Sequence, residues 1–218
     1  MTKQSKIRLI SAAVAGALAL GMGSAQALQQ GDWLVRVGAS MVSPNESSSN
    51  PQGGLPAGSE VSINNNTQLS FTIEYMLNNN IGLEVLGATP FKHDIEGAGA
   101  LAGVGKVGET KHLPPIVSVN WHFQPQSNIR PYVGAGINYT YFFDEKGAGP
   151  LANESLSLDN SWGLAAQAGV DFDINPNWFA NASIRYAKIS TTATYSNGYK
   201  LDVDIDPWVY TLAVGTHF

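Results

Sequence analysis

The residue types that most often carry out chemistry are few and scattered in this chain. The 218 residues include four histidines and no cysteine. Thiolate metal sites, cysteine nucleophiles and disulfide scaffolds are therefore excluded. A Ser–His–acid arrangement needs its members side by side in space, and the histidines fall in separate segments, at His93, His112, His122 and His217. We expect no enzyme activity, no cofactor and no metal centre.

Two local patterns resemble ligand-binding motifs. The sequence GVGKVG at 103–108 matches G-x-G-x-x-G, but neither the buried strand nor the helix that must flank a dinucleotide site is predicted around it. An external loop is the better interpretation. Asp202, Asp204 and Asp206 recur at every second residue and so share one strand face. They could attract divalent cations that bridge lipopolysaccharide phosphates, although a solvated acidic strand end is the preferred interpretation.

Composition indicates a membrane protein without membrane-spanning helices. Charged residues make up 13% of the chain, about half the share typical of soluble domains. Beyond the N-terminal segment no apolar run is long enough for a helical span. The formal net charge of −5 argues against nucleic-acid binding.

The N-terminus has the pattern of a cleaved secretory signal peptide, residues 1–27. Lys3, Lys6 and Arg8 precede an apolar stretch at 9–22, and the sequence AQA at 25–27 is a typical cleavage pattern. A membrane anchor is the alternative, and the short apolar stretch argues against it. We therefore expect an exported protein whose mature part is a single domain, residues 28–218.

Apolar residues alternate with small or polar ones throughout the mature part, which predicts β-strands. Any functional residue must therefore be positioned by strands or by the loops between them. In the last segment Tyr210, Leu212, Val214, Thr216 and Phe218 share one face. Eight such runs are predicted, at 31–42, 60–77, 81–94, 110–123, 130–143, 158–174, 178–194 and 199–218.

Short and long connections alternate along the chain, as in outer-membrane barrels. The connections at 78–80, 124–129 and 175–177 are short, whereas those at 43–59, 95–109 and 144–157 are long. Only the last connection, around 196–198, is a tight turn where a long loop is expected.

The distribution of charge decides which barrel face is outside. A soluble lipocalin-like barrel carries charges outside and apolar side chains inside. Here the charged strand residues lie opposite the large apolar ones, on a face rich in glycine, and aromatic residues gather near strand ends as in interfacial girdles. These aromatic residues are Trp33, Tyr75, Trp121, Phe123, Trp178, Trp208 and Phe218. The predicted fold is all-β, an eight-stranded antiparallel transmembrane β-barrel of the bacterial outer membrane.

Several stretches resemble the outer-membrane protein W (OmpW) family, including its AlkL-like branch. The residues that carry the resemblance are KHLPP at 111–115, RPYVGAGINYT at 130–140, DPWV at 206–209, NNTQL at 65–69, ATPF at 88–91 and DNSWG at 159–163. The resemblance implies an eight-stranded barrel for passage of small hydrophobic molecules, with an alkane-uptake branch. The strand that ends at Phe218 is similar to the assembly signal of such barrels.

Strand parity predicts the contents of the barrel interior. Inward polar residues in the lower lumen should pair into a plug. Toward the short-turn, periplasmic end these are Arg36, Glu74, Glu84, Asn120, His122, Asp171 and Asp173, and nearer the middle Arg185 and Gln167. Inward residues at or above mid-height predict an apolar funnel that opens outward, with contributions from Leu101, Val104 and Leu151 in the loops. The funnel residues are Leu86, Ala88, Ile116, Phe142, Ile189, Leu201, Val203 and Ile205, the last three on condition that no bulge at Pro207 reverses their phase.

Two consecutive prolines, Pro114 and Pro115, lack ladder donors and should open or bulge the fourth strand. One hypothesis is a lateral exit from the funnel into the membrane; the alternative is a bend in the barrel wall.

The leading functional hypothesis is a channel for passive uptake of small hydrophobic molecules. The expected partners are outer-membrane lipid, lipopolysaccharide, small hydrophobic solutes and the outer-membrane assembly machinery, which would read the strand ending at Phe218. The alternative is a structural or surface-interaction barrel with a closed lumen and partner-binding loops. A third class, an outer-membrane enzyme acting on lipid, lacks any local signature in the sequence.

Overall fold

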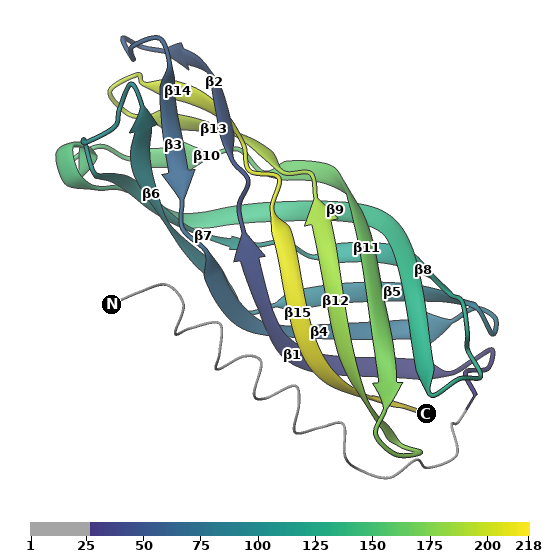
Figure 1. Ribbon diagram of the computed structural model, residues 1–218. Helices are drawn as coiled ribbons and strands as arrows, with labels where there is room; N and C mark the ends of the chain where they lie inside the picture. The colour runs from purple at the N-terminus through teal and green to yellow at the C-terminus, as the bar shows by residue number, and fades with distance from the viewer. Residues whose placement is uncertain (1–26) are drawn as a thin grey trace.

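The computed structural model describes residues 27–218 and shows a closed antiparallel β-barrel (Figure 1). The predicted signal peptide lies outside the described residues, apart from Ala27. No helix in the described part is long and apolar enough to cross a membrane. The lower strands, which form the transmembrane part, are β1(Trp33–Ser43), β4(Asn66–Met76), β5(Ile81–Ala88), β8(Ile116–His122), β9(Ile129–Gly147), β11(Ser161–Asp173), β12(Trp178–Ala187) and β15(Trp208–His217).

Shorter strands continue the barrel wall above the membrane part. They are β2(Ser47–Gln52), β3(Ser59–Ile63), β6(Phe91–Gly99), β7(Lys106–Leu113), β10(Leu156–Leu158), β13(Ser190–Tyr195) and β14(Lys200–Asp204), with a 3₁₀ turn, η1(Gly149–Leu151). Each continues one lower strand, and β9 alone runs through without a break, so eight long strands result. β1 pairs with β15 and closes the sheet, which confirms the predicted fold.

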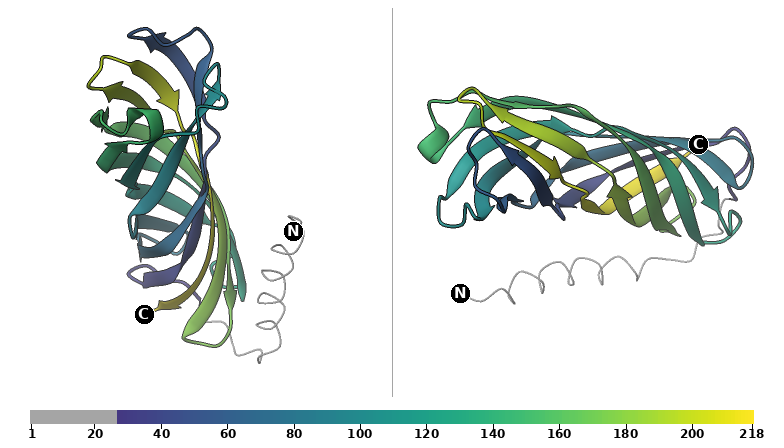
Figure 2. Two further views of the ribbon diagram at one scale, coloured as in Figure 1. Left: turned by 90° about the vertical axis from the view of Figure 1, so that its left-hand side faces the viewer. Right: turned by 90° about the horizontal axis from the view of Figure 1, so that it is seen from above.

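The eight long strands make an elongated tube (Figure 2). Two of the tight turns at its lower end are built by asparagine. The Asn78 side-chain oxygen accepts the backbone N–H groups of Asn80 and Ile81 at 2.8 and 2.9 Å. Asn175 accepts those of Asn177 and Trp178, both at 3.0 Å. Such side-chain turns close the short connections without glycine.

The outer face of the lower barrel is apolar and bounded by aromatic side chains. Trp33 pairs with Tyr75 at the lower rim, with ring centroids 4.9 Å apart, and Tyr139 pairs with Trp162 at the upper rim, at 4.6 Å. β1, whose last residue pairs with Trp208 of the upper rim, has 11 residues. A strand of that length tilted by about 40° rises about 25 Å, which matches the apolar band of outer-membrane barrels.

The predicted long loops are shorter than expected, because strands continue into them. The polar segment at 43–59 contains β2, which pairs with β14, and 95–109 contains the ends of β6 and β7. β2 shows no apolar alternation, because its sequence is polar throughout.

Above the membrane the wall divides into two four-stranded sheets. β3, β6, β7 and β9 form one, and β10, β13, β14 and β2 form the other. Side chains bridge the two seams between them. Glu46 accepts the Ile63 N–H at 3.0 Å on one side, and Glu145 accepts the Leu158 N–H at 3.2 Å on the other.

Candidate functional site: the barrel lumen

A buried ion-pair network fills the lower lumen. Its centre is Arg36, whose guanidinium contacts Glu74 at 2.8 Å, Asp171 at 2.9 Å and Glu84 at 3.4 Å. All four side chains are buried. Strand parity explains the convergence, because each lies on the inward face of its own strand, and the antiparallel register brings them to one height.

Three more predicted plug residues join the same network. Asn120 and His122 each contact the Glu74 carboxylate at 2.9 Å, and Arg185 contacts Glu84 at 2.9 Å. The structure therefore brings these seven predicted plug residues together. A buried carboxylate needs such partners, since leaving one unpaired costs several kcal/mol.

The plug contains further polar side chains on inward strand faces. Gln167 donates to Glu84 at 3.0 Å, and Asn181 donates to Asp171 at 2.7 Å. Arg130, a fully buried side chain, pairs with Asp173 at 2.7 Å. The signal for Arg130 was present in the sequence, because it has the same parity as the inward residues of β9.

An apolar layer closes the lumen below the network, at the periplasmic end. It consists of Leu28, Leu34, Met76 and Phe179. Leu28 precedes β1 and reaches this position because its backbone N–H is held by the Pro125 carbonyl at 2.8 Å. Strand patterns could not place it, since it belongs to no strand. The lower lumen is thus closed to water by a charge network and an apolar layer together.

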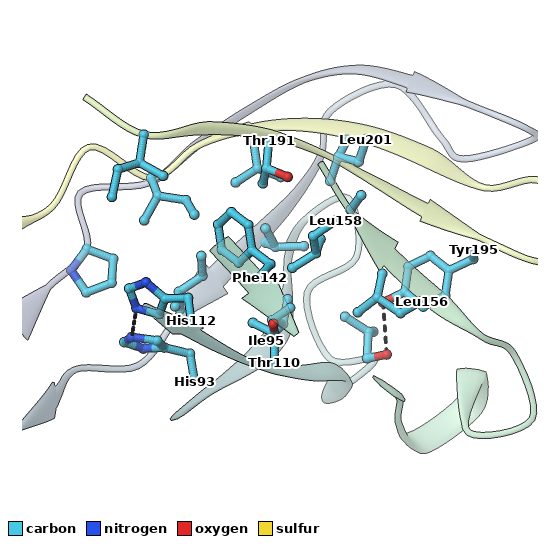
Figure 3. Close-up of a pocket in the computed structure, with 18 of the residues that line it drawn as sticks. His93, Ile95, Thr110, His112, Phe142, Leu156, Leu158, Thr191, Tyr195 and Leu201 are labelled. Atoms are coloured by element: carbon cyan, nitrogen blue, oxygen red, sulfur yellow. Dashed lines mark hydrogen bonds between the residues drawn. The ribbon is translucent and has the colours of Figure 1, made fainter. Parts of the chain in front are cut away.

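The upper lumen is a large apolar cavity between the two upper sheets (Figure 3). With its open mouth it encloses about 930 Å³. Five of the eight predicted funnel residues line it: Phe142, Ile189, Leu201, Val203 and Ile205. Leu101 and Leu151 line it from the loops, whereas Val104 is exposed to solvent and does not. The chain turns at Asp206, with φ 39°, but the inward phase of β14 is kept.

A smaller cavity of about 410 Å³ lies in the lumen at the height of the strand breaks. The other three predicted funnel residues, Leu86, Ala88 and Ile116, line it, and so does Pro114. Ile189 and His112 line both cavities. Pro115 is instead held in the wall, where its carbonyl accepts the Tyr139 N–H at 3.1 Å.

The wall is interrupted beside this smaller cavity. The pairing of β5 with β8 stops at Leu86 opposite Ile116, and that of β6 with β7 resumes at Phe91 opposite His112. No hydrogen bond within residues 27–218 joins the intervening segments 87–90 and 113–115 to each other. Three of those seven residues are prolines and supply no N–H.

The fourth long strand is interrupted between β7 and β8, but so are six of the other seven long strands near this height. At the other interruptions hydrogen bonds bridge the gap. Ile205 donates its N–H to the Ile189 carbonyl at 2.8 Å, for example, and the Asp94 N–H donates to the Asn64 side chain at 2.7 Å. The contrast distinguishes the proline-rich gap from the rest of the wall.

Two histidines stand at the junction of the cavities, on β6 and β7 above the upper aromatic rim. Nε2 of His93 lies 3.1 Å from Nε2 of His112, and Nδ1 of His93 lies 2.7 Å from the Asn64 carbonyl. Burial lowers the pKa of His93 below its usual range, and burial together with the charge of His93 lowers the pKa of His112 to about 3. Both rings are therefore neutral at pH 7.

Burial also raises the pKa of Tyr195, which lines the upper cavity, to about 12.

The remaining chemical patterns of the sequence form no ligand site in the described residues, although Val107 of the first one lines the upper cavity. The GVGKVG segment overlaps the β6–β7 hairpin, with no helix after it. Lys188 contacts Asp206 at 2.8 Å and Asp204 at 3.5 Å, so the acidic strand end has a cation of its own. On the outer surface, hydrogen bonds from Lys106 and then Lys92 lower the pKa of Glu109 to about 2.

Comparison with known proteins gives a consistent result across residues 29–218. A family model described as "OmpW family" matches residues 29–218. "Outer membrane protein W" of Vibrio cholerae is 50% identical over 87% of this chain and 90% of its own length. "Outer membrane protein AlkL" of Ectopseudomonas oleovorans is 30% identical over 87% of this chain and 83% of its own length. The crystal structure of OprG from Pseudomonas aeruginosa superposes with a TM-score of 0.82 at 34% identity, covering 88% of this chain and 98% of that one.

Proposed function

Because this chain belongs to the OmpW family of bacterial outer-membrane barrels, we propose that it is a channel for passive uptake of small hydrophobic molecules. The single observation that carries the proposal is the apolar cavity that opens outward above a closed plug. A purely structural barrel gains nothing from such a space, since filling it would stabilise the fold.

The plug determines which way a solute can go. An apolar molecule in the upper cavity would meet Arg36 and its carboxylates below, where no apolar surface replaces water. Continued passage downward would also require breaking buried ion pairs. The favourable direction is therefore sideways, out of the smaller cavity.

We place the lateral exit at the gap between segments 87–90 and 113–115. This gap adjoins the smaller cavity through Ala88 and Pro114, and no hydrogen bond among residues 27–218 has to break for the two segments to part. A solute leaving there would enter the outer leaflet near the upper rim. Outer-membrane lipid and lipopolysaccharide are the corresponding partners, and the assembly machinery would act on β15.

Uptake of a long-chain alkane into cells tests the proposal. Cells that produce the barrel should accumulate the alkane faster than cells without it, while entry of a small hydrophilic solute stays unchanged. Equal alkane entry would favour the alternative, a closed structural barrel whose loops bind partners.

Two variants separate the channel from its exit. Leu86→Asn places an amide in the smaller cavity and should slow alkane entry. The double variant Pro114→Val, Pro115→Val restores two N–H donors at the gap and should slow it as well. Unchanged uptake in the double variant would contradict the lateral exit and favour a mere bend, while leaving the channel itself in place.

A further inference from the structure

The polar atoms around the upper cavity are almost all occupied by the protein itself. Tyr195 donates its hydroxyl to the Val107 carbonyl at 3.0 Å, and Thr191 donates to the Asp159 carbonyl at 2.8 Å. The Thr110 hydroxyl donates to the Lys111 carbonyl at 3.2 Å. These hydroxyls are therefore committed as donors, and the rest of the inner lining is nearly all aliphatic or aromatic.

His112 is the exception. The side chain is 5% exposed, and its Nδ1 atom has no hydrogen-bond partner within residues 27–218. Nδ1 lies on the side of the ring turned away from His93, toward the cavity (Figure 3). A buried polar atom without a partner is costly. Because His112 lines both cavities, a molecule bound in them is the candidate partner for Nδ1.

The hydrogen bonds of the histidine pair determine whether Nδ1 of His112 is a donor or an acceptor. The Asn64 carbonyl can only accept, so Nδ1 of His93 carries the proton and its Nε2 is bare. Nε2 of His112 must then donate to Nε2 of His93, which leaves Nδ1 of His112 as a bare acceptor. Burial of both rings keeps them neutral, which maintains this assignment.

The ring of His112 is also held in place. Its ladder neighbours are Phe91 on β6 and Phe142 on β9. Their rings lie 5.4 and 5.8 Å from it between centroids. The acceptor is therefore a fixed polar point in an apolar wall, at the junction of the two cavities.

We propose that the lumen binds amphiphilic solutes that carry one hydrogen-bond donor on an apolar body, with the donor held by Nδ1 of His112. An alcohol, a phenol or an aromatic N–H compound has this chemistry. The inference rests on the proposed channel function and narrows its substrate class. An alkane would still fit the cavity but would leave Nδ1 unpaired, so the matching donor should bind more tightly.

A matched pair of probes tests this in the full barrel in lipid nanodiscs. 1-Naphthol carries the donor, and 1-methoxynaphthalene has the same ring system with the donor removed. We expect His112→Phe to weaken binding of 1-naphthol by about fivefold, the worth of one hydrogen bond, and to leave 1-methoxynaphthalene unaffected. Because lipid partitioning is the same for both proteins, the comparison between wild type and variant cancels it. His112→Gln, which retains an acceptor, should recover part of the 1-naphthol affinity that His112→Phe loses.

Nitrogen NMR of the wild-type histidines gives a second readout that needs no variant. The unprotonated Nδ1 resonance of His112 should shift with 1-naphthol and stay in place with 1-methoxynaphthalene. An equal response to both probes, or an unchanged naphthol affinity in His112→Phe, would overturn the inference while leaving the channel intact. If neither probe bound the wild-type barrel, both the proposed channel function and the inference about His112 would fail.

Discussion

Replacing Arg36 by methionine should severely destabilise the barrel, because its guanidinium contacts three of the buried carboxylates in the plug. Its guanidinium contacts Glu74, Asp171 and Glu84 at 2.8, 2.9 and 3.4 Å, and all of these side chains are buried. Methionine is similar in length but supplies neither charge nor donors. Buried carboxylates left without a partner cost about 3–5 kcal/mol in free energy of unfolding.

The guanidinium makes a second set of contacts that the variant also loses. It lies 5.4 Å from the ring centroids of both Tyr132 and Phe179. Arg36→Lys keeps the charge but not the planar fork of donors, so its cost should be smaller, about 1–2 kcal/mol. The order of stability should be wild type, then lysine, then methionine.

Urea unfolding of the barrel in lipid vesicles, followed by tryptophan fluorescence and gel mobility, measures these differences. Lys188→Met is the matched control, because it removes a similar cation from Asp206 at 2.8 Å on the exposed surface. Its cost should stay below about 1 kcal/mol. An Arg36→Met variant no less stable than this control would refute the description of the plug as a compensated buried charge network.

Three further predictions follow from other parts of the barrel. Gly134→Ala would push a Cβ into the Asn120 side chain and should lower the free energy of unfolding by about 1–3 kcal/mol. In the same urea assay Gly87→Ala should be neutral, because no atom lies within 4 Å of the added Cβ. The carboxyl carbon of Glu109 should titrate near pH 2 by NMR. The ion pairs of Glu109 are complete above its pKa in the unfolded chain and are lost as the pH falls through its pKa in the folded barrel. Titration near 4.5 would contradict the contacts with the two lysines. Glu145→Ala should speed hydrogen exchange of the Leu158 amide several-fold at the seam, and an unchanged rate would show that the bridge at 3.2 Å contributes nothing.

Much of the barrel could be predicted from the sequence, because one rule governs most of it. Period-two alternation assigns each strand residue to lipid or lumen, so Arg36 and Asp171 could be placed inward although 135 positions separate them. The same rule placed Leu201 and Val203 in the upper lumen. The closure of β1 on β15 followed, since lipid leaves no room for an unpaired edge.

Features outside that rule could not be predicted. Leu28 belongs to no strand, and its place under the plug depends on a hydrogen bond to Pro125. β2 was expected to be part of a loop because its sequence, SSSNPQ, is polar and does not alternate. The importance of His112 depends on which atoms surround its ring, and inward parity says nothing about a free nitrogen.

Methyl NMR of the barrel in lipid nanodiscs, titrated with decane, tests the central claim most directly. The account predicts shifts for methyl groups that line the upper cavity, such as Leu158 and Ile189, and none for Leu34 below the plug. Shifts confined to lipid-facing methyl groups such as Leu212, or shifts at Leu34, would contradict an apolar channel that is open above and closed below.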